Sequence, residues 1–302
     1  YPTGGNLSDR ALVGPNGDVY SVFYDSLIRF DAGGQVLQAI HAGGFRTLGL
    51  QSNGPVLWQG VNTDDTVKLR KYSFDGSLLW EKKHPIDGLV RDIALAPDQR
   101  ILVLYTTFNS SNLAIYKADG DFQTTRNYGL AVYFNLTFDA QGNHLAYGTS
   151  VSGPLEPNNA VNILKTNPTN GFVIWKKTYL IDRADIVTRI VSAPDNGLIL
   201  LGSTWLDTIP KPRLYRLNAN GNEVWKHIFQ TSKAVRLQDG AANPDGTFLI
   251  TGYQGEQPGV PAPTDAIVWK FSAQGLLFPN LLRGRIVRDT TGDCEAQAQE
   301  PG

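Results

Sequence analysis

The acidic segment near the end of the chain has the residue types and spacing of a calcium-binding loop. Counted from Asp289, oxygen-bearing side chains stand at positions 1, 3, 5, 7, 9 and 12, namely Asp289, Thr291, Asp293, Glu295, Gln297 and Glu300. Calcium prefers carboxylate and carbonyl oxygens in such a loop. Position 6, where an EF-hand loop needs glycine, is Cys294. We predict either a Ca²⁺ site at Asp289, Asp293, Glu295 and Glu300 or a solvated acidic linker.

Residues that could build a catalytic centre are few. The four histidines occupy unrelated positions in the sequence, which argues against a shared metal; they are His41, His84, His144 and His227. Because Cys294 is the one cysteine, an internal disulfide is excluded. The sequence has neither a Gly-x-Ser-x-Gly nucleophile motif nor a phosphate-binding loop. We therefore predict no catalytic residues.

Composition excludes several partners. The net charge is −1 and no basic stripe is present, so nucleic acid is a poor partner. No apolar stretch approaches the 18 or so residues of a membrane span. With 31 glycines, 17 prolines and 18% charged residues, the chain is typical of turn-rich all-β proteins. It begins at Tyr1 and has no methionine, so we expect it to be part of a longer protein.

One hairpin pattern recurs six times. A strand with aromatic or aliphatic residues leads into a polar turn with glycine, and a second strand, often with tryptophan, follows; the turn glycines are Gly34, Gly76, Gly120, Gly171, Gly221 and Gly275. A second set of turns alternates with the first, at Gly17, Gly54, Gln99, Gly142, Gly197 and Gly246. Asp-Gly and Asn-Gly are strong hairpin signals because such turns need a positive φ.

Two interleaved hairpins give each repeat four strands, A to D, and the repeat length suits one propeller blade. We predict an all-β fold, a six-bladed β-propeller of four-stranded antiparallel blades over residues 1–280. An open β-solenoid or a pair of sandwiches is the alternative. Residues 281–302 are predicted to be a linker and the start of a further module.

Propeller topology places the B–C loops and the start of strand A at the same end of each blade. The longest B–C loops, 149–160, 203–212 and 253–265, are therefore predicted to bind a ligand. Charged residues near strand A and one loop tryptophan add to this site: Arg46, Arg91, Asp92, Arg189, Trp205 and Asp239. The alternative is that the Arg and Asp side chains satisfy one another. Trp80, Trp175 and Trp225 share a repeat position and are expected in the core between blades.

The repeats resemble secreted β-propeller repeats of Bacteroidetes-type surface proteins, best in Asn220–Trp225 and Pro244–Gly252. This resemblance implies a secreted or cell-surface location. The stretch Thr169–Trp175 also resembles quinoprotein repeats, although the fuller tryptophan-docking motif is missing from most blades. Residues 282–302 resemble the opening of an SdrD B-like, immunoglobulin-type module, which implies further domains of the same polypeptide.

Four short motifs resemble the Asp-Ser/Thr-apolar O-glycosylation site of secreted Bacteroidetes proteins. Their acceptors are Ser26, Thr66, Thr208 and Thr290. Three of these lie at predicted B–C loops, where a glycan would be exposed.

Three functions fit these patterns. We favour a non-enzymatic propeller module of a large secreted or cell-surface protein that binds a protein or glycan in adhesion or extracellular assembly. A glycan-active or quinoprotein-like enzyme is the first alternative. The second is a purely structural spacer or filament subunit.

Overall fold

The computed structural model describes residues 11–14, 17–23, 26–41, 48–50, 57–63, 66–73, 75, 77–85, 88–108, 110–131, 133–149, 160–180, 186–204, 209–255, 265–278 and 282–285. Every element of regular structure in this part of the chain is a strand, so it contains no helix that could cross a membrane. The chain divides into two compact units. One consists of Tyr1–Thr137, His144–Val151 and Asn162–Lys176, and the other of Phe138–Asn143, Ser152–Val161 and Lys177–Gly302.

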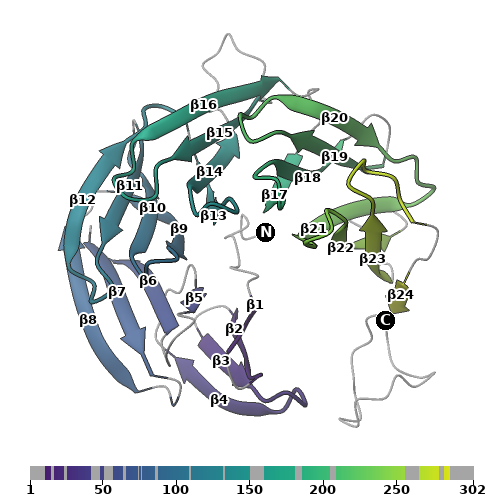
Figure 1. The fold of residues 1–302 in the computed structure, drawn as a ribbon. Helices are drawn as coiled ribbons and strands as arrows, with labels where there is room; N and C mark the ends of the chain where they lie inside the picture. Colours follow the sequence, from purple (N-terminus) through teal and green to yellow (C-terminus); the bar gives the residue numbers. More distant parts are fainter. Residues whose placement is uncertain are drawn as a thin grey trace. The chain divides into compact units, whose positions relative to one another are not determined.

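The strands of the described residues form six four-stranded sheets, each in chain order (Figure 1). The first three sheets consist of β1 (Ala11–Val13), β2 (Val19–Phe23), β3 (Ser26–Phe30) and β4 (Val36–His41); β5 (Leu48–Leu50), β6 (Leu57–Thr63), β7 (Thr66–Tyr72) and β8 (Leu78–Pro85); and β9 (Leu89–Leu95), β10 (Ile101–Thr106), β11 (Ser111–Tyr116) and β12 (Phe122–Asn127). Consecutive strands pair antiparallel.

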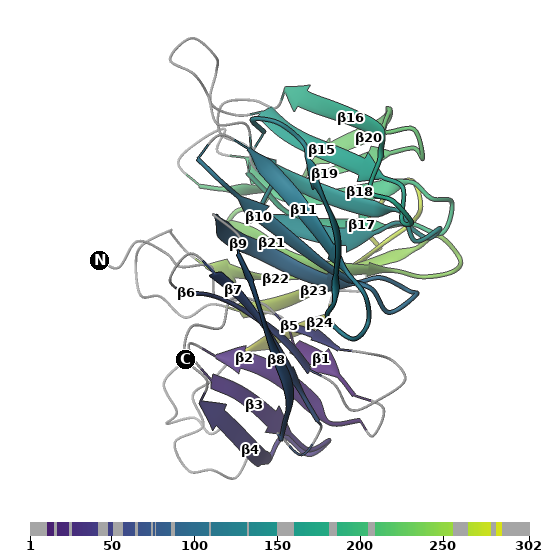
Figure 2. The same ribbon diagram turned by 90° about the vertical axis from the view of Figure 1, so that its left-hand side faces the viewer.

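The other three sheets repeat this order. They consist of β13 (Asn135–Phe138), β14 (His144–Thr149), β15 (Ala160–Thr166) and β16 (Val173–Leu180); β17 (Ile186–Ser192), β18 (Leu198–Thr204), β19 (Lys211–Leu217) and β20 (Glu223–Ile228); and β21 (Ala234–Ala242), β22 (Phe248–Gly255), β23 (Asp265–Phe271) and β24 (Leu282–Arg285). Figure 2 shows the same strands from the side. The predicted four-stranded antiparallel units are confirmed.

Most of the predicted turns among the described residues share one hydrogen-bond pattern. In the turn from β3 to β4, Asp31 N donates to Gln35 O and Gly34 N donates to Asp31 O. Gly34 has a φ of 83°, which only glycine adopts without strain. One turn differs from the prediction: between β17 and β18 the positive φ, 62°, falls on Asn196 rather than on Gly197. Asparagine tolerates this conformation, and a Cβ on Gly197 would lie 2.5 Å from Leu217 O.

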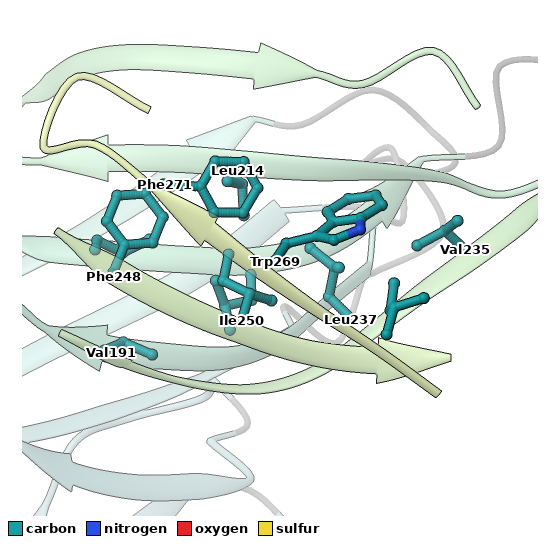
Figure 3. Close-up of a cluster of buried hydrophobic side chains, with 11 residues drawn as sticks. Val191, Leu214, Val235, Leu237, Phe248, Ile250, Trp269 and Phe271 are labelled. Carbon is teal, nitrogen blue, oxygen red and sulfur yellow. The ribbon is translucent and has the colours of Figure 1, made fainter. Parts of the chain in front are cut away.

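Apolar side chains fill the space between successive sheets within each unit. One cluster joins β17–β20 to β21–β24, and Figure 3 shows Phe248, Phe271, Trp269 and Ile250 packed against Leu214 and Leu237. The rings of Phe248 and Phe271 are stacked with centroids 5.1 Å apart. A similar cluster joins β5–β8 to β9–β12 and includes Leu69, Ile93 and Tyr116. A four-stranded sheet cannot shield both its faces alone, and these clusters are how neighbouring sheets cover one another.

The sheets differ in how fully their faces are covered. Every residue of β18 and β19 is buried, so both faces of that sheet are covered. In contrast, β22 begins with alternating buried and exposed residues. Side chains alternate between the two faces of a strand, so one face of the last sheet is open to solvent. Its exposed residues include Arg236, Asp239 and Thr251.

The fourth strands of the second and fourth sheets begin with exposed apolar residues. Leu78 and Leu79 begin β8, and Val173 and Ile174 begin β16; each of the four is about half exposed. Two lysines lie further along each strand, Lys82 and Lys83 in β8 and Lys176 and Lys177 in β16. Each of these strands is the outer edge of its sheet.

The fourth strand of the last sheet lies beyond residue 280, so the predicted boundary is wrong. We expected Leu276–Phe278 to be this strand because it follows the turn at Gly275. In the structure only Leu277 forms an isolated bridge there, with Phe271. The strand that pairs with β23 is β24, in which Leu282 lies opposite Val268 and Arg285 opposite Asp265. Residues 282–285, read as the opening of an SdrD B-like module, therefore complete the last sheet; residues 286–302 lie outside the described part.

Candidate functional site

The antiparallel order brings two kinds of connection to the same end of each sheet. The link from the second to the third strand and the link from the fourth strand to the next sheet both lie at the end opposite the glycine turns. We call this the loop end. In the third sheet, the loop end contains the turn after Thr106 and the segment after Asn127.

A short turn at the loop end of the third sheet displays a phenylalanine. Thr107 N donates to Ser110 O over 2.9 Å, and the hydroxyls of Thr107 and Ser110 are 2.9 Å apart. Asn112 Nδ2 donates to Ser110 Oγ over 2.9 Å. These bonds fix the turn, whereas the side chain of Phe108 is 99% exposed. A fixed turn that carries an exposed aromatic ring loses little entropy when that ring is buried by a partner.

A second exposed apolar residue, Leu130, lies at the same end of this sheet. Ser111 N donates to Gly129 O and Tyr128 N donates to Ser111 O, both over 2.9 Å. This places the segment that contains Leu130 beside the first residue of β11. Leu130 is 75% exposed. Phe108 and Leu130 are therefore joined to the same strand end through Ser110 and Gly129.

Arg91, a predicted site residue, also lies at the loop end of this sheet. It occupies a bulge of β9, where the register with β10 shifts between Leu104 and Tyr105. Its Nε donates to Thr106 Oγ1 over 2.8 Å, and its guanidinium lies 5.1 Å from the ring centroid of Phe134. The bulge thus turns Arg91 toward the last residue before the Phe108 turn.

Asp92, the next predicted residue, is 3% exposed. Its Oδ1 accepts a hydrogen bond from Ile93 N over 2.8 Å, and its Oδ2 accepts one from Leu136 N over 2.7 Å. Leu136 belongs to β13, so this carboxylate links the first strand of the third sheet to the first strand of the fourth. Buried N–H groups need such acceptors, and we infer that Asp92 positions these strands.

Arg189 and Asp239 form an ion pair in the second unit. Arg189 Nε lies 3.0 Å from Asp239 Oδ1, which also accepts from Gly240 N over 2.8 Å. Both residues directly follow a bulge in the first strand of a sheet, as Asp92 does. The pair is partly exposed, because the Asp239 side chain is 59% accessible. For these two residues, the predicted alternative of mutual pairing describes the contact.

Two buried tyrosines support the segment that carries Leu130. Burial raises the pKa of Tyr128 to about 12, and burial also raises the pKa of Tyr133. Both side chains therefore stay neutral at physiological pH. The Tyr128 hydroxyl donates to Gly171 O over 2.9 Å, and Tyr133 N donates to Ser111 Oγ over 3.1 Å.

Several predicted site residues lie outside the described residues. They are Arg46, Trp205, Thr208, Asp289, Thr290, Asp293, Glu295 and Glu300, together with the side chains of Ser26 and Thr66 and the interiors of the three long loops. Within the described part, no three His, Cys, Asp or Glu side chains gather as a metal site would require.

The chain matches no protein-family model and no curated protein sequence. It is similar to many solved structures. A structure titled "Structure of Dos1 propeller" aligns with a TM-score of 0.60 at 12% identity, over 90% of this chain and 69% of that one. The fold is a β-propeller. Kuenenia stuttgartiensis hydrazine synthase aligns with a TM-score of 0.63 at 12% identity, over 89% of this chain and 78% of that one.

A further propeller, titled "Streptogramin B lyase structure", has a TM-score of 0.59 at 12% identity, and covers 96% of this chain and 86% of that one. The titles thus include two enzymes. At such low identity the likeness concerns the propeller fold alone.

The sequence reasoning missed Phe108 and Leu130. It looked for long loops and charges, whereas these residues lie in short connections. A signal was present: Phe108 is an aromatic residue inside the four-residue polar stretch Thr107–Ser110, where no alternating strand pattern accounts for it.

Proposed function

We propose that this propeller is a non-enzymatic binding module of a larger secreted or cell-surface protein, and that its contact surface is the loop end of its blades. The observation that carries this proposal is the fully exposed ring of Phe108 on a hydrogen-bonded turn. Large aromatic anchors dominate the binding energy of protein interfaces when a partner's pocket covers them. Leu130, exposed at the same end, extends the apolar surface.

The chemistry next to the ring favours a protein partner over a glycan. A sugar that stacks on an aromatic ring also needs polar groups beside it. Here the polar side chains of Thr107, Ser110 and Asn112 hydrogen-bond to one another. Binding a sugar would require breaking this network, whereas an apolar pocket would leave it intact.

The residues predicted from the sequence to bind a ligand have a secondary role in the proposed contact surface. Arg46, Arg91, Arg189, Trp205 and Asp239 remain proposed members of the contact surface. Charges at the rim of an interface steer association and specificity more than they add affinity.

A binding assay with a matched control tests the proposal. The protein is applied to an array of purified extracellular proteins and to a glycan array, beside Phe108→Ser and Phe172→Ser. Phe172 is also well exposed, but it lies at the glycine-turn end of the fourth sheet. We expect wild type and Phe172→Ser to bind the same proteins, and Phe108→Ser to bind them at least tenfold more weakly, the scale of a hot-spot residue. Equal binding by both variants, or binding to glycans alone, would overturn the proposal.

We also propose that the propeller has six blades that close into one ring, as the sequence predicts. The six four-stranded sheets support this proposal. A compact chain of this length should have a radius of gyration of about 19 Å, which small-angle X-ray scattering measures. A clearly larger value would contradict a closed ring.

A further inference from the structure

The outer strands carry a repeated contact to the following sheet. Tyr128 follows β12, and its hydroxyl donates to Gly171 O of the next glycine turn over 2.9 Å. Tyr179 in β16 donates in the same way to Gly221 O over 2.6 Å. Each tyrosine stands eight residues after the glycine of its own turn, Gly120 or Gly171. We call this contact the latch, because it joins the outer strand of one sheet to the turn of the next.

His84 occupies the latch position of the second sheet, eight residues after Gly76. The backbone of Gly120, the glycine of the next turn, lies near this ring and favours its protonated form, which acts to raise the pKa of His84. The ring packs against Tyr116, with centroids 4.5 Å apart, and against Phe122, with centroids 6.3 Å apart. A titratable imidazole thus stands where the following two sheets have a tyrosine.

The surroundings of His84 suit a neutral ring. Its Nε2 is buried and has no hydrogen-bond partner among the described residues. Neutral imidazole has one N–H donor and one acceptor nitrogen, whereas the protonated ring has two donors. Protonation would therefore place an N–H at Nε2, where the described residues offer it no acceptor. A buried polar group without a partner is costly.

The nearby charges do not compensate for this cost. Lys82 on the same strand repels a protonated ring, while Asp121 attracts it. Asp121, however, already pairs with the Lys82 ammonium. The third titratable neighbour, Tyr116, is held neutral because burial raises its pKa. Burial likewise lowers the pKa of His84 below its usual value.

We propose that His84 makes the contact between the second and third blades acid-sensitive, so that protonation loosens this latch and leaves the tyrosine latches unchanged. The folded state binds the proton less readily than the unfolded state does. Stability is therefore fully present above the unfolded pKa of about 6.5 and decreases as the pH falls through that value toward the lower folded pKa. One group of this kind changes the folding equilibrium by at most about tenfold per pH unit.

Hydrogen exchange of the whole chain tests this proposal, because it reports each blade contact separately. Amide protection in β8 and β12 is compared between pH 7.5 and pH 5 for wild type, His84→Phe and His84→Tyr. His227→Gln is the matched control, since His227 also contacts a turn carbonyl of the next sheet, Gln274 O at 3.2 Å. Dividing each exchange rate by the intrinsic rate at the same pH removes the effect of pH on intrinsic exchange.

We expect wild type and His227→Gln to lose several-fold protection in β8 and β12 at pH 5, with β16 and β20 unchanged. In both His84 variants, the protection of β8 and β12 relative to that of β16 and β20 should not change with pH, whatever the absolute stability of the variant. A wild-type loss that persists in both His84 variants would overturn the proposal. So would a loss spread evenly over all blades.

Discussion

Replacing Asp92 by alanine tests whether this residue holds the first strands of two blades together. Its carboxylate is 3% exposed and accepts hydrogen bonds from Ile93 N and Leu136 N over 2.8 and 2.7 Å. Alanine would leave two buried N–H groups without these acceptors. Each such loss costs about 1–3 kcal/mol, so Asp92→Ala should lower the free energy of unfolding by about 2–6 kcal/mol.

Asp239 is the matched control because it has the same place after a strand bulge but a different environment. Its side chain is 59% exposed and pairs with Arg189. Partly exposed ion pairs are worth about 0–1 kcal/mol, so Asp239→Ala should change stability by no more than that. Urea unfolding at pH 7, followed by tryptophan fluorescence, measures both variants.

The comparison also separates a structural role from a binding role. If Asp92→Ala unfolds within about 1 kcal/mol of wild type, or loses no more stability than Asp239→Ala, the inferred positioning role is wrong. That result would instead favour the prediction from the sequence that Asp92 contacts a ligand.

Two further perturbations probe the contacts between blades. Gly120 and Gly34 both have a φ of 83°, but an added Cβ at Gly120 would meet the Trp80 indole, with Cζ2 at 2.9 Å, whereas Gly34 has nothing within 4 Å. Gly34→Ala should lower the free energy of unfolding only by the backbone strain of about 1–2 kcal/mol, and Gly120→Ala should lower it clearly more. Urea unfolding measures both variants. Equal losses of stability would contradict the packing of Trp80 on this turn. The raised pKa of Tyr128, about 12, predicts that stability present below pH 10 decreases as the pH rises from 10 to 12. Tyr128→Phe should lose less stability over that range in alkaline unfolding curves, and an identical alkaline loss would refute this.

Much of the scaffold was predictable because turn chemistry is local. A glycine at the fourth position of a five-residue turn has the same backbone need wherever it occurs, so Gly34 and Gly120 marked their hairpins correctly, and Gly275 marked its turn. The last blade was misjudged because pairing is not local. The turn at Gly275 is present, but the strand that pairs with β23 begins only at Leu282.

The side-chain contacts were less predictable. Trp80, Trp175 and Trp225 were expected in the core between blades; all three are half-buried, and Trp80 and Trp225 pack against the clusters between successive sheets. Trp225 and Trp80 pack on the turn glycines Gly275 and Gly120 of the next sheet. Asp92 illustrates the same limit, because its partner Leu136 is 44 residues away in the chain. Charge and position near the first strand suggested a ligand, whereas only the packed structure reveals that two backbone amides occupy both carboxylate oxygens.

The lysines that follow the exposed apolar residues of β8 and β16 affect the tendency of the protein to aggregate at high concentration. An outer strand offers unpaired amides and carbonyls to any other strand, and a chain of repeated blades multiplies that hazard. For a foreign strand to anneal along β16, the ammonium groups of Lys176 and Lys177 would have to give up water. Fragments that keep Phe172–Ile174 but lack these lysines should therefore form fibrils far more readily than the intact chain.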